Sequence, residues 1–251
     1  MESKLYYDIH THTVYSHGKG TIEDNAKAAE AAGLKILGIS DHGPGHIGFG
    51  LDMKKIPEMR RDIAASKELH PGLDIRLGVE ANIINPSGRL DVRPDELQLF
   101  DYIIAGYHFG VVGEAPFRSV ATHTGGFWYS VTGRSTQRTR IYNTDLVLKA
   151  LDVNKIDIIS HPGAKASFDI DAIASACRGT ETLLEINNRH GCLTVEGIKQ
   201  AMRYDVKFIA SSDAHVPEFV GVVDEALRRA RKAGLDPSRI VNLRKEYYWN
   251  C

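Results

Sequence analysis

The sequence predicts an α/β fold in which βα units are repeated around a parallel sheet. Short runs rich in β-branched residues alternate along the chain with amphipathic helical stretches, as such units require. Several of the runs are continuously apolar, which is typical of strands covered on both faces. The seven expected strands are residues 5–9, 36–39, 75–79, 102–105, 156–159, 182–186 and 206–210.

Capping residues and glycines indicate where the helices begin and end. Thr21 opens the first helix as its N-cap, and Gly33 ends that helix. Pro71 and Gly72 follow the second helix, which is expected over residues 56–69. The remaining helices are expected near residues 143–154, 171–177, 194–204 and 217–233.

Length and composition indicate one barrel-sized domain. The chain has 251 residues, of which 43% are hydrophobic and 25% charged, enough to bury a full core. A formal net charge of -1 gives no general attraction to nucleic acid or to an anionic membrane. The three cysteines form no disulfide framework or zinc motif, and no signal peptide or apolar membrane segment is apparent, so we expect a cytoplasmic protein.

One segment, at about residues 109–140, is too long for an ordinary βα loop. It follows the fourth strand and is rich in Gly, Thr and aromatic residues. Because active sites of parallel barrels lie at the C-terminal ends of the strands, we expect this insertion to shape access of the substrate. Trp128 and Tyr129 either close over a substrate or pack the loop.

Nine potential metal ligands follow the predicted strands. His10 and His12 are two residues apart, so both point to one face of an extended backbone. The sixth strand has no clear ligand, and Glu185, Asn187 and Asn188 near its end either support the ligands or contact substrate. The nine are His10, His12, His17, His42, Glu80, His108, His161, Asp213 and His215.

These nine residues predict one polynuclear metal site at the C-terminal ends of the strands. Without cations, so many imidazoles and carboxylates would be costly to bury together. They exceed the needs of one tetrahedral ion and suggest two or three, with imidazole favouring zinc, iron or manganese and Glu80 as the bridging candidate. Asp8 and Asp41 either orient imidazoles or cap strand ends.

The motifs around the ligands resemble those of the PHP (polymerase and histidinol phosphatase) family over nearly the whole chain. They are His-Thr-His-Thr-Val-Tyr-Ser-His-Gly, Ser-Asp-His-Gly, Gly-Val-Glu-Ala-Asn, Ala-Gly-Tyr-His, Ser-His-Pro-Gly and Ser-Asp-Ala-His. Leu-Glu-Ile-Asn-Asn and Ile-Ile-Ala-Gly-Tyr-His are especially similar to the stand-alone YcdX-type phosphatases of that family. We therefore expect residues 1–251 to form a single PHP domain with the insertion described above.

The resemblance implies a distorted (β/α)7 TIM-like barrel that holds three divalent metal ions, most often zinc, with manganese or iron as alternatives. His17 departs from the family pattern, because many relatives have Asp at that place. Carried over motif by motif, the expected ligand sets are His10, His12, Glu80 and Asp213 for the first ion, His17, His42 and His215 for the second, and Glu80, His108 and His161 for the third.

The expected function is a metal-dependent phosphatase that hydrolyses a small phosphate monoester. Clustered dications would neutralise phosphate oxygens and supply a metal-bound hydroxide, with no covalent enzyme intermediate. Glu80 and Asp213 are the expected catalytic residues, and Asp213 or a metal-bound water would protonate the leaving group. Lys165, Arg189 and Arg134 are candidates to bind the phosphate, and Arg138 and Arg140 are further ones.

Three alternatives stay open at this stage. A phosphodiesterase or nuclease of the same family shares the chemistry, although the near-neutral charge and the lack of a basic aromatic stripe argue against nucleic acid. An amidohydrolase-type metal hydrolase also begins with His-x-His, but that family usually has eight strands and a bridging lysine. A metal-bearing module without hydrolytic activity is the third. No feature indicates a membrane partner or an oligomeric state.

Four histidines follow no strand in this way, and we do not expect them to be ligands. They are His46, His70, His123 and His190. His70 lies at a helix end and is expected at the surface.

Overall fold

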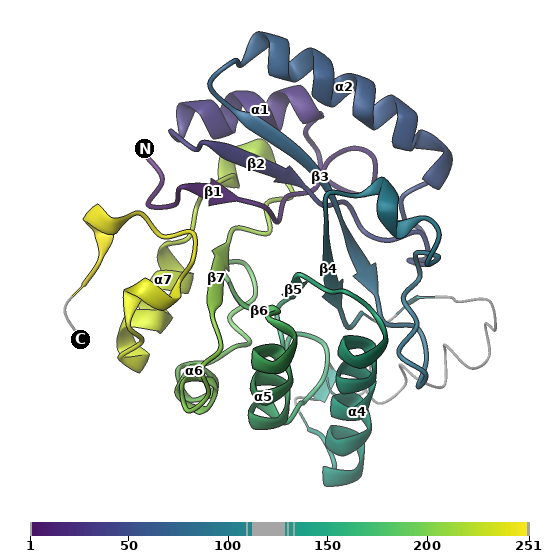
Figure 1. The fold of residues 1–251 in the computed structure, drawn as a ribbon, viewed down its shortest axis with the longest axis vertical. Helices are drawn as coiled ribbons and strands as arrows, with labels where there is room; N and C mark the ends of the chain where they lie inside the picture. The colour runs from purple at the N-terminus through teal and green to yellow at the C-terminus, as the bar shows by residue number, and fades with distance from the viewer. Residues whose placement is uncertain (1, 109, 112–128, 130, 133, 250–251) are drawn as a thin grey trace.

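The computed structural model contains seven parallel strands that are hydrogen-bonded in sequence order, β1 to β7 (Figure 1). It describes residues 2–108, 110–111, 129, 131–132 and 134–249. The strands are β1 Tyr7–Asp8, β2 Ile36–Ile39, β3 Asp74–Asn82, β4 Tyr102–Gly106, β5 Ile158–Ile159, β6 Leu183–Asn187 and β7 Phe208–Ser211. This confirms the predicted α/β barrel, in which β1 and β5 are shorter than expected and β3 is longer.

The barrel is nearly closed by two contacts between its first and last strands. Beyond the C-terminal ends of the strands, Thr11 pairs with Ala214, and the His12 N–H donates to the Ala214 carbonyl at 2.8 Å. At the other end, a segment after the last helix lies between β1 and β7. There Val241 N–H bonds Phe208 at 2.9 Å, and Tyr6 N–H bonds Asn242 at 2.8 Å. The chain's last segment therefore completes the barrel wall.

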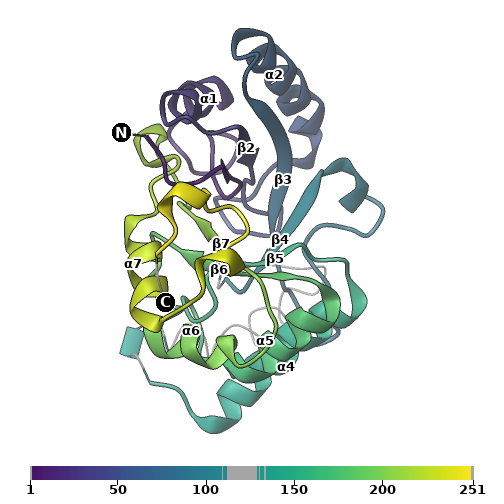
Figure 2. The ribbon, with the colours of Figure 1, turned by 60° about the vertical axis from the view of Figure 1, so that its left-hand side comes forward.

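Helices cover the outside of the strands, with α1 and α2 over β1 to β3 and the others around the rest of the barrel (Figures 1 and 2). Thr21 caps the first helix as predicted: its Oγ1 accepts from Asp24 N–H, and Asp24 accepts from Thr21 N–H in return. The helices are α1 Ile22–Ala31, α2 Ile56–Leu69, α4 Gln137–Val153, α5 Ile170–Thr180, α6 Val195–Met202 and α7 Asp224–Ala233, with short 3-10 turns η1 Met53–Lys55, η2 Leu97–Leu99, η3 Pro217–Phe219, η4 Pro237–Arg239 and η5 Lys245–Tyr247.

Two predicted helices were placed wrongly. The helix expected from residue 143 begins at Gln137, because the Thr136 side chain accepts from Thr139 N–H and caps it there. The continuous helix expected over 217–233 is broken into η3 and α7. Gly221 lies in the break with φ of 76°, and its N–H donates to the buried Asp8 carboxylate at 2.9 Å, so the chain leaves the helical path to reach β1.

A small apolar cluster fills the lower part of the barrel interior. It consists of Tyr102, Ile104, Ile158 and Ile209. Gly38 and Gly78 are required there, because a Cβ on either would lie within 2.3 Å of an atom of the Tyr102 side chain. This cluster closes the interior of the barrel below the C-terminal ends of the strands. The polar residues at those ends therefore lie in a pocket rather than in a channel.

Most of the predicted insertion at 109–140, including Trp128 and His123, lies outside the described residues. Its last four residues belong to α4. Among the helices that the structure describes, none has the length and apolar character to cross a bilayer.

Candidate metal centre

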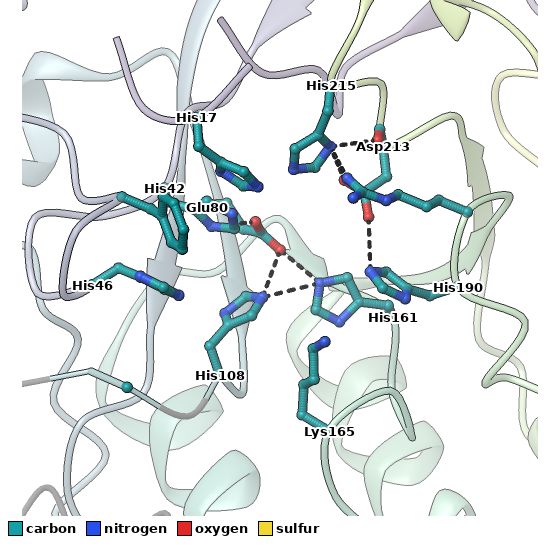
Figure 3. Close-up of a pocket in the computed structure, with 13 residues that line it drawn as sticks. His17, His42, His46, Glu80, His108, His161, Lys165, His190, Asp213 and His215 are labelled. Atoms are coloured by element: carbon teal, nitrogen blue, oxygen red, sulfur yellow. Dashed lines mark hydrogen bonds and ion pairs between the residues drawn. The ribbon is translucent and has the colours of Figure 1, made fainter. Parts of the chain in front are cut away.

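Seven of the nine predicted ligands line one cavity of about 400 Å³ at the C-terminal ends of the strands (Figure 3), and His10 and His12 lie behind them, at 3.4 Å from Glu80 and 3.3 Å from Asp213. Glu80 lies inside β3 rather than after it, and Asp213 lies two residues beyond β7. Seven of the nine are buried, while His17 and His215 are half-buried. Residues from six strands or their loops, separated by more than two hundred positions between His10 and His215, therefore meet in one place.

The Glu80 carboxylate lies at the centre of the cluster. Its Oε1 is 2.8 Å from Nε2 of His161, 3.4 Å from that of His10 and 3.5 Å from that of His108. Its Oε2 instead faces His42, with Nδ1 at 2.9 Å, and His12, with Nε2 at 3.7 Å. The two oxygens thus point to two different groups of imidazoles, as a bridging carboxylate requires.

Asp213 joins the opposite side of the cluster. Its Oδ1 lies 3.3 Å from His12 Nε2, 3.9 Å from His10 Nε2 and 3.3 Å from His215 Nδ1. The His17 ring stacks on His42 at 4.9 Å between centroids and meets His215 at 4.2 Å. In three groups the ligand atoms lie within 4.8 Å of one another, namely His10, His12 and Asp213; His12, His42 and His215; and His42, Glu80 and His108.

Several buried atoms of this cluster have no hydrogen-bond partner among the described residues. A buried polar atom without a partner costs about 1–3 kcal/mol, so such a concentration needs a ligand. The unpartnered donor set fits divalent ions, because it offers imidazole lone pairs and a carboxylate oxygen in one place. The atoms are Nε2 of His10, Nδ1 and Nε2 of His12, Nδ1 of His17, Nδ1 of His42 and Oε2 of Glu80.

Glu185 holds two of the imidazole-bearing residues in position. Its Oε1 accepts from His10 Nδ1–H at 2.6 Å, and its Oε2 accepts from the His161 backbone N–H at 2.5 Å. Ser211 and Asn187 also donate to this carboxylate. The hydrogen bond from His10 turns its Nε2 toward Glu80 Oε1, which lies 3.4 Å away, and supporting residues orient metal-binding histidines in this way. Glu185 therefore holds His10 and His161 in place, which agrees with the first of its two predicted roles.

A second chain of hydrogen bonds orients His108. The Asn82 carbonyl accepts from His108 Nδ1–H at 2.7 Å, and its amide Nδ2 donates to Asp91 at 2.5 Å. Asp91 also accepts from the N–H groups of Asn82 and Gly45, at 2.8 and 3.0 Å. Asp91 thus fixes which way the Asn82 amide faces, and Asn82 fixes the tautomer of His108. Sequence analysis missed this chain.

Asp8 and Asp41 accept hydrogen bonds from backbone N–H groups, in agreement with the interpretation as strand-end caps. Asp8 accepts from Ser212 and Gly221, and Asp41 accepts from the N–H and Oγ1–H of Thr13 at 2.8 and 2.6 Å. Neither bonds an imidazole among the described residues. Asn188 is also structural, because its Oδ1 accepts from the second and third N–H groups of α7, those of Glu225 and Ala226.

Backbone strain is concentrated in the same place. His161 and Asp213 have φ of 24° and 54°, a region uncommon for residues other than glycine. The Glu185 carboxylate holds the His161 N–H, and the Asp213 carbonyl accepts from His215 Nδ1–H at 2.9 Å. The strained backbone at His161 and Asp213 thus directs both side chains into the cavity.

Burial and mutual repulsion keep most of the imidazoles neutral. Burial lowers the pKa of His17 and His215 to about 4 and that of His12 well below 6.5. Burial alone would raise the pKa of Glu80 and Asp213, but the neighbouring imidazoles hold both well below their ordinary values. Neutral imidazoles and ionised carboxylates are the forms that bind metal ions.

Comparison with known proteins decides the family. The family model described as PHP domain matches residues 8–189, and one described as PHP-associated matches residues 196–227.

The chain belongs to the PHP family.

Its relatives include a probable phosphatase of Clostridium acetobutylicum, 31% identical, with 95% of this chain and 91% of that protein covered. A probable phosphatase of Thermoanaerobacter sp. (strain X514) is 30% identical over the same shares. The crystal structure of histidinol phosphate phosphatase from Lactococcus lactis, complexed with zinc, L-histidinol and phosphate, aligns with a TM-score of 0.60 at 15% identity, covering 92% of this chain and 94% of that one. That likeness shows the shared barrel fold.

The cavity that the candidate ligands line also contains two of the three predicted phosphate-binding cations. Lys165 and Arg189 line it, and the Arg189 guanidinium approaches His215 Nδ1. Arg134 is exposed and is not among the described residues of the cavity wall. Arg140 is directed elsewhere, since it bonds the Phe168 carbonyl at 3.0 Å.

Of the histidines that follow no strand, two line the cavity without belonging to the three ligand groups, and one, His70, was wrongly expected at the surface. His46 and His190 line the cavity, with His190 Nε2 at 3.6 Å from Asp213 Oδ2. An Asx-type turn gives the only sequence signal for His190, because its N–H donates to the Asn187 side chain at 2.7 Å. His70 is not at the surface: it is 7% exposed, because α1 covers it.

Proposed function

We propose that this PHP protein is a metal-dependent phosphatase that hydrolyses a small phosphate monoester with three divalent ions. The observation that carries the proposal is the position of Glu80, whose two carboxylate oxygens face two separate groups of imidazoles. The names of the relatives support the phosphatase activity. The zinc in the histidinol phosphate phosphatase and the predominance of imidazole here support zinc.

The proposed ligand sets follow the clusters of the cavity. His10, His12, Glu80 and Asp213 would hold the first ion, and Glu80, His108 and His161 the third. His17, His42 and His215 would hold the second, with His12 near them. The His17 ring lies against both partners, which supports its place in the set although relatives often have Asp there.

Divalent ions held by these residues would offset the charge of the phosphate and would lower the pKa of a water molecule toward about 7, so that hydroxide could attack phosphorus. The chain's own residues supply the remainder. Lys165 and Arg189 line the cavity on the solvent side of the cluster and would bind phosphate oxygens. Asp213 is ionised and faces His190 Nε2 at 3.6 Å, so this pair would relay the proton that the attacking water releases to the leaving oxygen. Glu185 and Asn82 hold His10 and His108 in the orientation that the ions need.

The test combines metal analysis with phosphate release. The purified protein should bind three equivalents of zinc and release phosphate from para-nitrophenyl phosphate. It should have little activity on bis(para-nitrophenyl) phosphate or single-stranded DNA, which a phosphodiesterase or nuclease would favour. His12→Ala should lose metal and turnover together. His70→Ala is the matched control, because it removes a buried histidine away from the cavity. Normal phosphatase rates in metal-free His12→Ala would refute the proposal.

A further inference from the structure

A second hollow of about 450 Å³ adjoins the metal centre. The loops after β1, β6 and β7 form it, and the Lys19 N–H donates to the His215 carbonyl at 2.8 Å, which ties the first loop to the last. The two cavities share His17, Arg189, Asp213 and His215. Arg189 therefore lines both, and the second hollow borders the proposed phosphate site.

The outer wall of this second hollow is apolar. Phe219 is 58% exposed, although it is a large aromatic residue, and the half-buried Val216 lies beside it. Binding pockets for small molecules typically combine such walls with a few polar groups that fix orientation. Covering the Phe219 ring with an apolar ligand would remove that surface from water.

Besides Arg189, which contacts His215, the described wall of the hollow contains one further cation, Lys19. Lys19 is exposed and forms no ion pair with any residue that the structure describes. The only carboxylate among the described residues of the wall is Asp213, which faces the imidazoles of the metal centre. The hollow thus has an apolar wall and an unpaired ammonium group.

We propose that the second hollow binds the alcohol part of the substrate, and that this alcohol has an apolar body and a carboxylate. The inference rests on the proposed function, which places the phosphate at the metal centre. The apolar body would contact Phe219 and Val216, and the carboxylate would pair with Lys19. A singly charged carboxylate suits a single ammonium group better than a second phosphate dianion does.

Phosphonates test this assignment without turnover, because their carbon–phosphorus bond is not hydrolysed. The probes are methylphosphonate, 3-carbamoylbenzylphosphonate and 3-carboxybenzylphosphonate, titrated calorimetrically into zinc-loaded protein. The two benzyl probes differ in charge and hardly in shape. We expect the carboxy probe to bind about fivefold more tightly than the carbamoyl probe, and Lys19→Gln to abolish this difference. Phe219→Ala should weaken both benzyl probes about tenfold and leave methylphosphonate unchanged.

Lys207→Gln is the matched control, because Lys207 is an exposed lysine at the other end of β7. Equal weakening of all three probes by Lys19→Gln would overturn the inference, since Lys19 would then bind the phosphonate group itself. Equal binding of the two benzyl probes to the unmodified protein would overturn it as well. Hydrolysis of para-nitrophenyl phosphate is measured separately and decides the proposed function alone.

Discussion

The two ends of the barrel differ in whether their buried polar groups find hydrogen-bond partners within the protein. At the N-terminal end, Asn242 is fully buried and donates to the carbonyls of Tyr7 and Ala210 at 2.8 and 2.7 Å, while it accepts from Ala210 N–H. Arg239 likewise donates to three carbonyls. At the C-terminal end, both nitrogens of His12 and one oxygen of Glu80 have no hydrogen-bond partner among the described residues.

This difference separates polar groups that build the fold from polar groups that bind something else. Buried groups that the protein satisfies itself add to stability and need no ligand. Buried groups without partners are retained at a cost in stability, which a bound ion offsets. The comparison predicts that substitutions at the two ends have different consequences, and the predictions below can break it.

The largest effect is expected from Glu80→Gln. The substitution keeps the shape but removes the charge that both groups of imidazoles face. Turnover of para-nitrophenyl phosphate should fall about 10³-fold or more, as expected when a central electrostatic group is lost. Bound zinc, measured by mass spectrometry, should fall with it. Glu68→Gln on the exposed face of α2 is the control. Full zinc content in Glu80→Gln would contradict the bridging role.

At the opposite end, Asn242→Ala should reduce stability and leave the metal centre intact. The substitution leaves one N–H and two carbonyl groups between β1 and β7 without their partner. The free energy of unfolding should fall by about 3 kcal/mol, measured by urea denaturation. Zinc content of the folded protein is the control. Loss of zinc at unchanged stability would mean that this end also serves the metal site.

Asp91→Asn tests the hydrogen-bond chain that orients His108. An asparagine at this position would place an NH2 group against one of the N–H donors that Asp91 now accepts. The Asn82 amide could then flip and present its NH2 group to His108. Zinc affinity of the weakest site should fall about 10- to 100-fold, the usual effect of such supporting residues, as measured by competition with a chelator. Asp95→Asn, an exposed change nearby, is the control.

The sequence predicted the strands well, and it predicted that the candidate ligands lie close together, for a local reason. Apolar runs mark the strands, and a residue directly after a parallel strand lies at the same barrel end as its counterparts. His42 and His161 could therefore be placed without coordinates. The class of fold and the family were confirmed.

Contacts that depend on tertiary packing could not be predicted. The break before α7 arises because Asp8, 213 positions earlier, takes the Gly221 N–H. Asp91 reaches Asn82 from a loop without periodicity, and His190 enters the cavity through a turn. The burial of His70 depends on how α1 packs on α2. No residue near His70 in the sequence indicates this packing.

His70 gives the smallest effect and sharpens the comparison within one residue type. Unlike the described histidines of the cavity, it has a carboxylate hydrogen-bonded to each ring nitrogen, Glu30 at 2.8 Å and Glu23 at 3.0 Å. These hydrogen bonds raise its pKa above 6.5. The stabilisation is therefore fully present below pH 6.5, where the ring is also charged in the unfolded chain, and it is lost as pH rises through the folded-state pKa.

His70→Gln retains hydrogen-bonding capacity and removes the titration. The difference in unfolding free energy between the unmodified protein and the variant should be below about 1 kcal/mol near pH 6, because both glutamates are partly exposed. It should shrink toward pH 9, as measured by urea denaturation at each pH in the presence of zinc. Glu30→Gln should remove part of the same pH dependence. If the difference in unfolding free energy between the two proteins is constant with pH, His70 contributes by packing alone. In that case, pairing with protein carboxylates does not distinguish His70 from the histidines of the cavity.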